Sequence, residues 1–126
     1  MRNNNLTPIV ILALNLDSEE LEQQAISRFT GKDYTRPSLV GCYKGEDERS
    51  YIIDAVENSL DEILAFAKQY KQESILYLDN QRLATLVFDK DNSVSLGRFK
   101  SVSESNATSR DAYTYNPVNN TYYIAE

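Results

Sequence analysis

The strongest constraint on the fold is an unbroken apolar run, Ile-Val-Ile-Leu-Ala-Leu, at positions 9–14. Because the run has no polar face, a strand here must be buried on both faces or nearly so. Asp17 follows, and Glu20 comes three residues later, which is the capping-box pattern of a helix N-terminus. A buried strand that leads directly into a helix predicts a sheet with helices packed against it.

Hydrophobic spacing predicts a second helix and a series of further strands. The second helix begins at Ser59, which forms a capping box with Glu62, and the first has its buried side around Leu21 and Phe29. The predicted strands span residues 38–43, 49–56, 75–78, 83–88 and 94–99, with a loop at 101–110 and a terminal hairpin at 113–115 and 121–124.

This order of elements predicts the fold class. Strand, helix, strand, strand, helix, strand is the split βαβ order, so we expect an α+β, ferredoxin-like antiparallel sheet with two helices on one face. The remaining C-terminal strands are expected to extend that sheet. A fold of this kind hosts many activities and does not by itself identify one.

Composition narrows the class of protein. The chain of 126 residues is predicted to form one domain, residues 1–126, and its net charge of −6 disfavours partners such as nucleic acid or an anionic membrane. The lone Cys42 excludes an intramolecular disulfide and indicates a reducing, cytoplasmic location, and the run at 9–16 is too short to span a membrane. Because the chain has no histidine, proton chemistry must rely on carboxylates, tyrosines, lysines or arginines, and no spacing suggests a metal site.

The predicted hairpin around residues 44–47 places a phenol and a carboxylate where the chain reverses. Tyr43 precedes this turn and Glu48 follows it, so both are candidate site residues. A structural alternative is that Tyr43 covers a sheet edge while Glu48 is solvated. Cys42, which has no histidine to activate it, is interpreted as a small packing residue, and Gly41 as either a packing accommodation or a point of close ligand approach.

Three further groups have both a structural and a functional interpretation. Ser18 caps the first helix or binds a carboxylate at its N-terminus. Gln72 follows the second helix, where it satisfies helix carbonyls or contacts a ligand. The tyrosines at positions 113, 115, 122 and 123 pack on the sheet or line a flat aromatic pocket at a subunit boundary.

Several of these pieces, in this order, resemble the small bacteriophage S-adenosylmethionine lyases, formerly called hydrolases. The resemblance covers most of the chain from about position 9 onward. Its elements are the apolar first strand, Gly41-Cys42-Tyr43 with a basic residue after it, Glu48-Arg49-Ser50, Gln72-Glu73, Leu86-Val87-Phe88 and the terminal hairpin from Tyr113 to Ile124. The connection between Tyr43 and Glu48 is shorter here than in the family.

The resemblance implies an activity and an assembly. It implies cleavage of S-adenosylmethionine to 5′-methylthioadenosine and homoserine lactone without metal or cofactor, by a homotrimer with sites between subunits. The family's functional residues fall on Tyr43, Glu48 and Gln72, and Ser18 is a weaker candidate for holding the methionine end. The resemblance also implies an anti-restriction role in the cytoplasm of a host cell, through depletion of S-adenosylmethionine.

The predicted chemistry needs few protein groups. The sulfonium is already a good leaving group, and the substrate carboxylate can attack its own γ-carbon, so the enzyme has chiefly to hold the reactive conformer. Hydrolysis with Glu48 activating a water is the alternative mechanism. Two alternatives without turnover are a small-ligand-sensing module and an inhibitor that binds a host protein through its acidic face. Formation of methylthioadenosine separates the enzyme from both.

Overall fold

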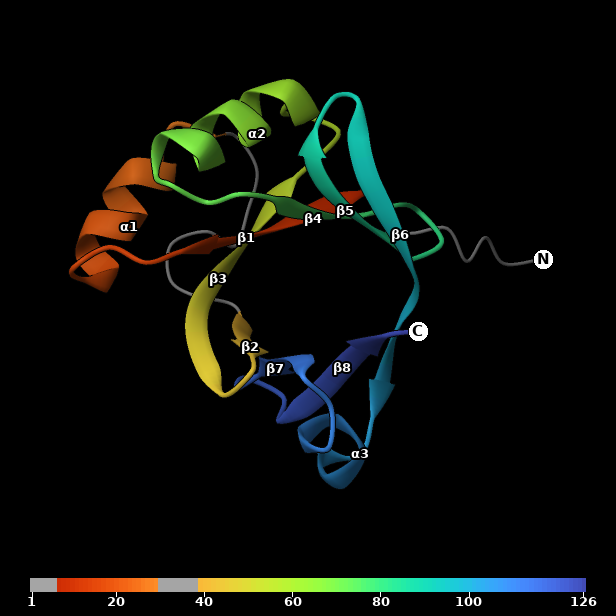
Figure 1. The fold of residues 1–126 in the computed structure, drawn as a ribbon. Helices are drawn as coiled ribbons and strands as arrows, with labels where there is room; N and C mark the ends of the chain where they lie inside the picture. Colours follow the sequence, from red (N-terminus) through yellow and green to blue (C-terminus); the bar gives the residue numbers. More distant parts are fainter. Residues whose placement is uncertain (1–6, 30–38) are drawn as a thin grey trace.

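Eight antiparallel strands close into a barrel in the computed structural model, which describes residues 7–29 and 39–126 (Figure 1). Around the barrel the strands follow the order β1-β3-β2-β7-β8-β6-β5-β4, and β4 pairs with β1. In chain order the elements are β1 (Ile9–Leu14), α1 (Glu19–Ile26), β2 (Leu39–Tyr43), β3 (Glu46–Asp54), α2 (Leu60–Gln69), β4 (Ile75–Leu78), β5 (Leu83–Asp89), β6 (Asn92–Val102), α3 (Glu104–Thr108), β7 (Ala112–Asn116) and β8 (Thr121–Ala125).

The barrel shows that the prediction of a ferredoxin-like sheet was wrong. An open sheet of that type leaves two edge strands, whereas here β7 pairs with β2 and β8 pairs with β6. The C-terminal strands therefore do not lengthen one edge of a sheet but connect the two edges to each other. Closure removes the unpaired backbone groups that edge strands would expose.

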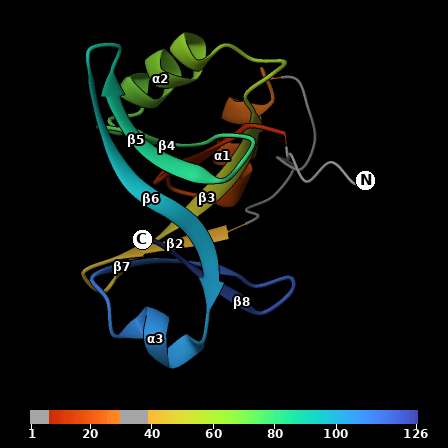
Figure 2. The same cartoon turned by 90° about the vertical axis from the view of Figure 1, so that its right-hand side faces the viewer.

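Alternate residues along β1 and β3 face two separate cores. Val10, Leu12 and Leu14 belong to the larger cluster, which α1 and α2 cover from outside the barrel. Ile11 and Leu39 belong to a smaller cluster inside the barrel. Figure 2 shows α1 and α2 over one part of the wall and α3 at the opposite end. The apolar run at 9–14 is therefore buried on both faces, as its composition predicts.

Local signals set most element boundaries. The predicted helix N-cap at Ser59 is confirmed, because the Glu62 backbone N–H donates to Ser59 Oγ at 3.0 Å. The first helix is capped by Ser18 rather than Asp17, with the Leu21 amide donating to Ser18 Oγ at 3.2 Å. The hairpin turn is shorter than predicted: Lys44 and Gly45 both have positive φ, 50° and 84°, so β3 already begins at Glu46.

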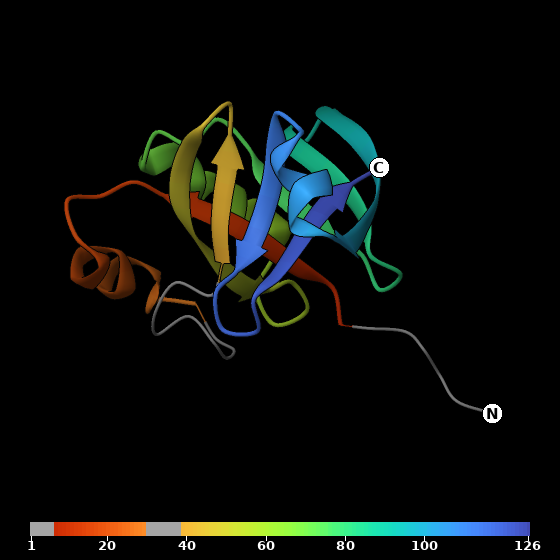
Figure 3. The ribbon, with the colours of Figure 1, turned by 90° about the horizontal axis from the view of Figure 1, so that it is seen from below.

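The C-terminal part of the barrel agrees with the predicted strands and adds a short helix. The terminal hairpin is confirmed as β7 and β8, and α3 lies in the predicted loop at 101–110. Figure 3 shows β2, β7 and β8 side by side, with α3 over β7 and β8. Gly97, at φ +95°, lets the last residue approach β6, because a Cβ there would lie 2.3 Å from the Glu126 carbonyl carbon.

Candidate active site

Tyr43 and Glu48 lie on one face of the β2–β3 hairpin. Glu48 pairs with Gly41, and Tyr43 pairs with Glu46, so Tyr43 and Glu48 are diagonal neighbours, about 7–8 Å apart at their Cα atoms. Leu39, on the same face of β2, belongs to the core inside the barrel. The structure therefore brings these two predicted residues together on the inward side of the hairpin, where Tyr43 is 59 % exposed and Glu48 is half-buried.

Gly41 lies opposite Glu48 on the inward face of the hairpin. It is flanked by Glu48 on β3 and by Thr114 on β7, and it has no side chain to fill the position between them. A Cβ at Gly41 would approach Ser50 Oγ to 3.3 Å. A side chain at position 41 would therefore crowd Ser50, and the inward hairpin face places a carboxylate and a phenol around this glycine.

Ser18 lies in the other half of the candidate site, at the N-terminus of α1. A groove of about 540 Å³ lies next to it, between the β1–α1 connection, α1 and the end of α2. We call this the α1 groove; its lining consists of Asn15, Leu16, Asp17, Leu21, Gln24, Ala25 and Tyr70. Gln72 follows Tyr70 by two residues. Its backbone N–H donates to the Ala67 carbonyl at 2.9 Å, which closes the last turn of α2.

The four predicted residues fall into two groups within one chain. Tyr43 and Glu48 face inward, whereas Ser18 and Gln72 belong to elements that cover the outer face of the barrel. Arg49 shows the division, because it follows Glu48 on β3 but its side chain contacts α1 on the other face. One chain thus brings Tyr43 and Glu48 together, whereas Ser18 and Gln72 lie with the elements on the other side of the barrel wall.

The sequence reasoning missed a buried carboxylate that joins α1 to β3. Glu22 is 0 % exposed, and Arg49 donates to its two oxygens from Nε at 2.7 Å and from Nη2 at 2.8 Å. The Tyr51 hydroxyl donates to Oε1 at 2.7 Å, and the Leu16 amide donates to Oε2 at 3.0 Å. Arg49 also donates to the Leu16 carbonyl at 3.1 Å. Every oxygen of the buried carboxylate is therefore paired.

The hydrogen bonds to Glu22 decide its charge. Burial raises the pKa of this carboxyl, but the bonds from Arg49, Tyr51 and Leu16 outweigh burial and hold the pKa below its usual 4.5. Burial and the adjacent carboxylate raise the pKa of Tyr51, and the bond to Glu22 raises the pKa of Arg49. Glu22 is thus an anion that locks Leu16, a residue of the α1 groove, to β3.

Loss of this network should show in the pH dependence of stability. A carboxyl whose pKa is lower in the folded state stabilises the protein above its unfolded-state pKa, and this contribution disappears as the pH falls through the folded value. Glu22→Gln should lower the free energy of unfolding by about 2 kcal/mol at pH 7, since Arg49 is left without its anion but is 38 % exposed and can rehydrate. Urea unfolding at pH 7 and at pH 3 measures both effects.

The difference between Glu22→Gln and the original chain should be smaller at pH 3 than at pH 7, because pH 3 lies below the usual pKa of a glutamate and the stabilisation from a lowered folded-state pKa is lost as the pH falls. A matched control is Glu20→Gln on the exposed side of the same helix, which should change stability by less than about 0.5 kcal/mol. Equal losses for the two variants at pH 7 would contradict the role assigned to the Glu22 network.

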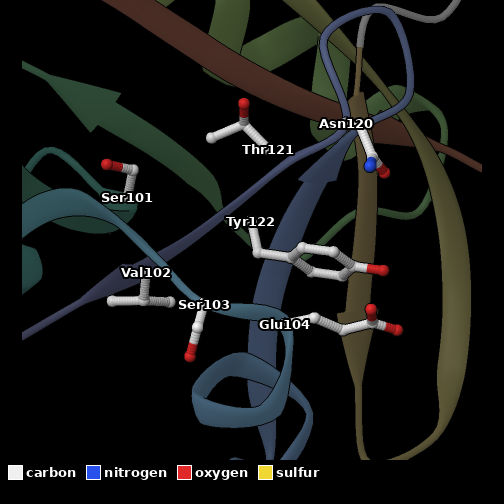
Figure 4. Close-up of a pocket in the computed structure, with 7 residues that line it drawn as sticks. All are labelled: Ser101, Val102, Ser103, Glu104, Asn120, Thr121 and Tyr122. Carbon is white, nitrogen blue, oxygen red and sulfur yellow. The ribbon is translucent and has the colours of Figure 1, made fainter.

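The tyrosine cluster predicted from the sequence divides between the two sides of the barrel wall. Tyr122 lies between Tyr115 and Tyr113, with ring centroids 4.6 Å and 5.9 Å away, whereas Tyr123 stacks on Phe99 at 5.1 Å. A second groove, of about 430 Å³, adjoins Tyr122 (Figure 4); it is lined by Ser101, Val102, Ser103, Glu104, Asn120, Thr121 and Tyr122. Burial and the nearby Glu104 carboxylate raise the pKa of Tyr122.

Cys42 lies on the outer side of the hairpin, away from Glu48. It pairs with Tyr113 of β7, and their hydrogen bond raises the pKa of Tyr113 to about 12.

Residues 7–29 and 39–126 contain no helix long and apolar enough to cross a membrane. Within the same ranges, no group of three histidine, cysteine or acidic side chains is placed to hold a metal ion.

Comparison with known proteins identifies the family. The family model described as the S-adenosylmethionine lyase family matches residues 14–126, which is most of the chain. No curated protein matches the sequence. The matched region includes the β2–β3 hairpin with Tyr43 and Glu48, the α1 segment with Ser18, and Gln72. The chain therefore belongs to the S-adenosylmethionine lyase family and is an enzyme that acts on S-adenosylmethionine.

Proposed function

We propose that this enzyme converts S-adenosylmethionine to 5′-methylthioadenosine and homoserine lactone. An oxygen of the substrate carboxylate attacks the substrate's own γ-carbon as the bond between that carbon and the sulfonium breaks. The bonding electrons pass to sulfur, which leaves as a neutral thioether, while the amino group stays protonated. Atoms and charge balance without a metal, a water molecule or a proton transfer.

The observation that supports this proposal is the inward face of the hairpin, where Tyr43 and the half-buried Glu48 are diagonal neighbours. Such a face can position a flexible substrate but offers no histidine base. Positioning a substrate that reacts with itself is worth up to roughly 7–11 kcal/mol in favourable cases. Because the reaction cancels a carboxylate against a sulfonium, a partly apolar surrounding disfavours the charged ground state more than the transition state.

The charge change constrains the role of Glu48. A carboxylate against the sulfonium would stabilise a positive charge that the reaction destroys, and ground-state binding of this kind does not accelerate the step. We assign Glu48 instead to the substrate ammonium, whose charge persists, or to the Tyr43 hydroxyl. In either role it fixes the amino acid portion for ring closure.

We further propose a homotrimer whose active sites lie between subunits. Support comes from the division of the predicted residues. Tyr43 and Glu48 face the inside of the barrel, whereas Ser18 and Gln72 belong to elements on its outer face. A neighbouring copy in a cyclic assembly can bring the hairpin of one subunit to the outer face of the next. We propose a cytoplasmic location and an anti-restriction role through depletion of S-adenosylmethionine.

Isotope labelling tests the mechanism against hydrolysis. In ¹⁸O-labelled water the first product should be unlabelled homoserine lactone, because the tethered carboxylate reacts faster than water. Early time points are analysed by mass spectrometry, before the lactone hydrolyses in solution, with synthetic lactone in the same water as the control. Labelled homoserine that appears at once, without a lactone precursor, would favour the hydrolase mechanism.

A further inference from the structure

We propose that the α1 groove binds the adenosyl portion of S-adenosylmethionine. This inference rests on the proposed function, because it names the part of the same substrate that the hairpin does not hold. The groove has a volume of about 540 Å³, within the range of small-molecule sites. It lies beside Ser18 and ends at Tyr70, two residues before Gln72.

The lining of the groove matches the chemistry of a purine nucleoside. Tyr70 supplies a half-buried aromatic ring, which Phe66 holds from behind at 4.8 Å between centroids. Leu21, whose side chain is 46 % exposed, forms an apolar wall of the groove. Asn15 and Gln24 provide amide donors and acceptors for a base edge, and the exposed Asp17 carboxylate can accept from ribose hydroxyls.

The Glu22 network makes this groove rigid at its inner end. Both backbone groups of Leu16 are fixed, the amide by Glu22 and the carbonyl by Arg49. Asn15 and Asp17, on either side of Leu16, are therefore presented from a connection whose position is set before a ligand arrives. Pre-organised sites lose less entropy on binding.

The groove at Tyr122 is less suited to this ligand. Tyr122 already contacts two other rings, whereas the one described ring contact of Tyr70 is with Phe66. Its lining is dominated by the hydroxyls of Ser101, Ser103 and Thr121, together with Glu104, whose carboxylate lies toward the Tyr122 hydroxyl in Figure 4. Stacking of a purine therefore favours the α1 groove, where the Tyr70 ring borders open space.

The test measures binding separately from turnover. Calorimetry with 5′-methylthioadenosine and with its 2′-deoxy analogue compares the original chain with Asp17→Asn. Asp17 does not cap the helix, so this change should leave folding intact. We expect Asp17→Asn to weaken methylthioadenosine binding about tenfold and to remove the preference for the ribose 2′-hydroxyl. Asp91→Asn, on the exposed β5–β6 turn, is the matched control and should bind normally.

A second variant tests stacking at the other end of the groove. Tyr70→Leu should lower the affinity for methylthioadenosine and for its 2′-deoxy analogue about tenfold. Tyr70→Phe keeps the ring, so its affinity for both ligands should equal that of the original chain. Affinities that are unchanged in both Asp17→Asn and Tyr70→Leu would overturn the assignment of the groove. No binding of methylthioadenosine to the original chain would overturn it as well. Binding that depends on these residues, without turnover, would support the groove and refute only the proposed reaction.

Discussion

Glu48→Gln is expected to lower kcat/KM for S-adenosylmethionine by on the order of 100-fold. The substitution preserves size and removes the charge from a half-buried position opposite Gly41. An ammonium group or the Tyr43 hydroxyl then loses a charged acceptor, and the reactive conformer is held less well. Fold and assembly should be retained, because no other side chain depends on the Glu48 carboxylate in the described hydrogen bonds. Chromatography of methylthioadenosine measures the loss.

Glu46→Gln on the same hairpin separates a specific role from a general effect of charge. Glu46 points to the same face as Glu48 but is exposed next to the turn, so its neutralisation should change kcat/KM by less than about twofold. Equal losses of kcat/KM in the two variants would show that the hairpin acts through the summed electrostatic field of its acidic residues. Full activity of Glu48→Gln would exclude Glu48 from the site.

The sequence predicted local structure better than global closure. The β2–β3 hairpin, the cap at Ser59 and the β7–β8 hairpin all involve residues within a few positions of one another. By contrast, β2 pairs with β7 across about 70 residues, and no period or capping motif reports which strand edges meet at that separation. The ferredoxin-like prediction was wrong because it treated these nonlocal pairings as extensions of one edge.

The buried Glu22 shows a similar limit within the candidate site. The predicted buried side of α1 included Leu21, which is 46 % exposed, and omitted Glu22, which is fully buried. A signal was present: Glu22 lies four residues before Ile26 and seven before Phe29, on the same helix face. Arg49 and Tyr51 alternate on one strand face, but their position opposite Glu22 depends on tertiary structure that the sequence pattern does not report.

Mixed assemblies of two impaired variants should recover activity if the sites are shared between subunits. Glu48→Gln damages the hairpin half, and Leu21→Trp is designed to fill the α1 groove from a partly exposed position without disturbing the core. When a site takes its hairpin from one subunit and its groove from the next, random mixing leaves some sites with both halves intact. For equal amounts of the two variants, about a quarter of the sites should be intact.

The measurement is methylthioadenosine formation after the two variants are unfolded together and refolded, compared with each variant refolded alone. Light scattering in the same samples should report a trimer, and activity should fall when dilution dissociates it. Rescue requires that the groove of one copy faces the hairpin of another, because a site contained in one chain always has one damaged half. An active monomer at assay concentration, or mixed assemblies no more active than either parent, would place the whole site within a single subunit.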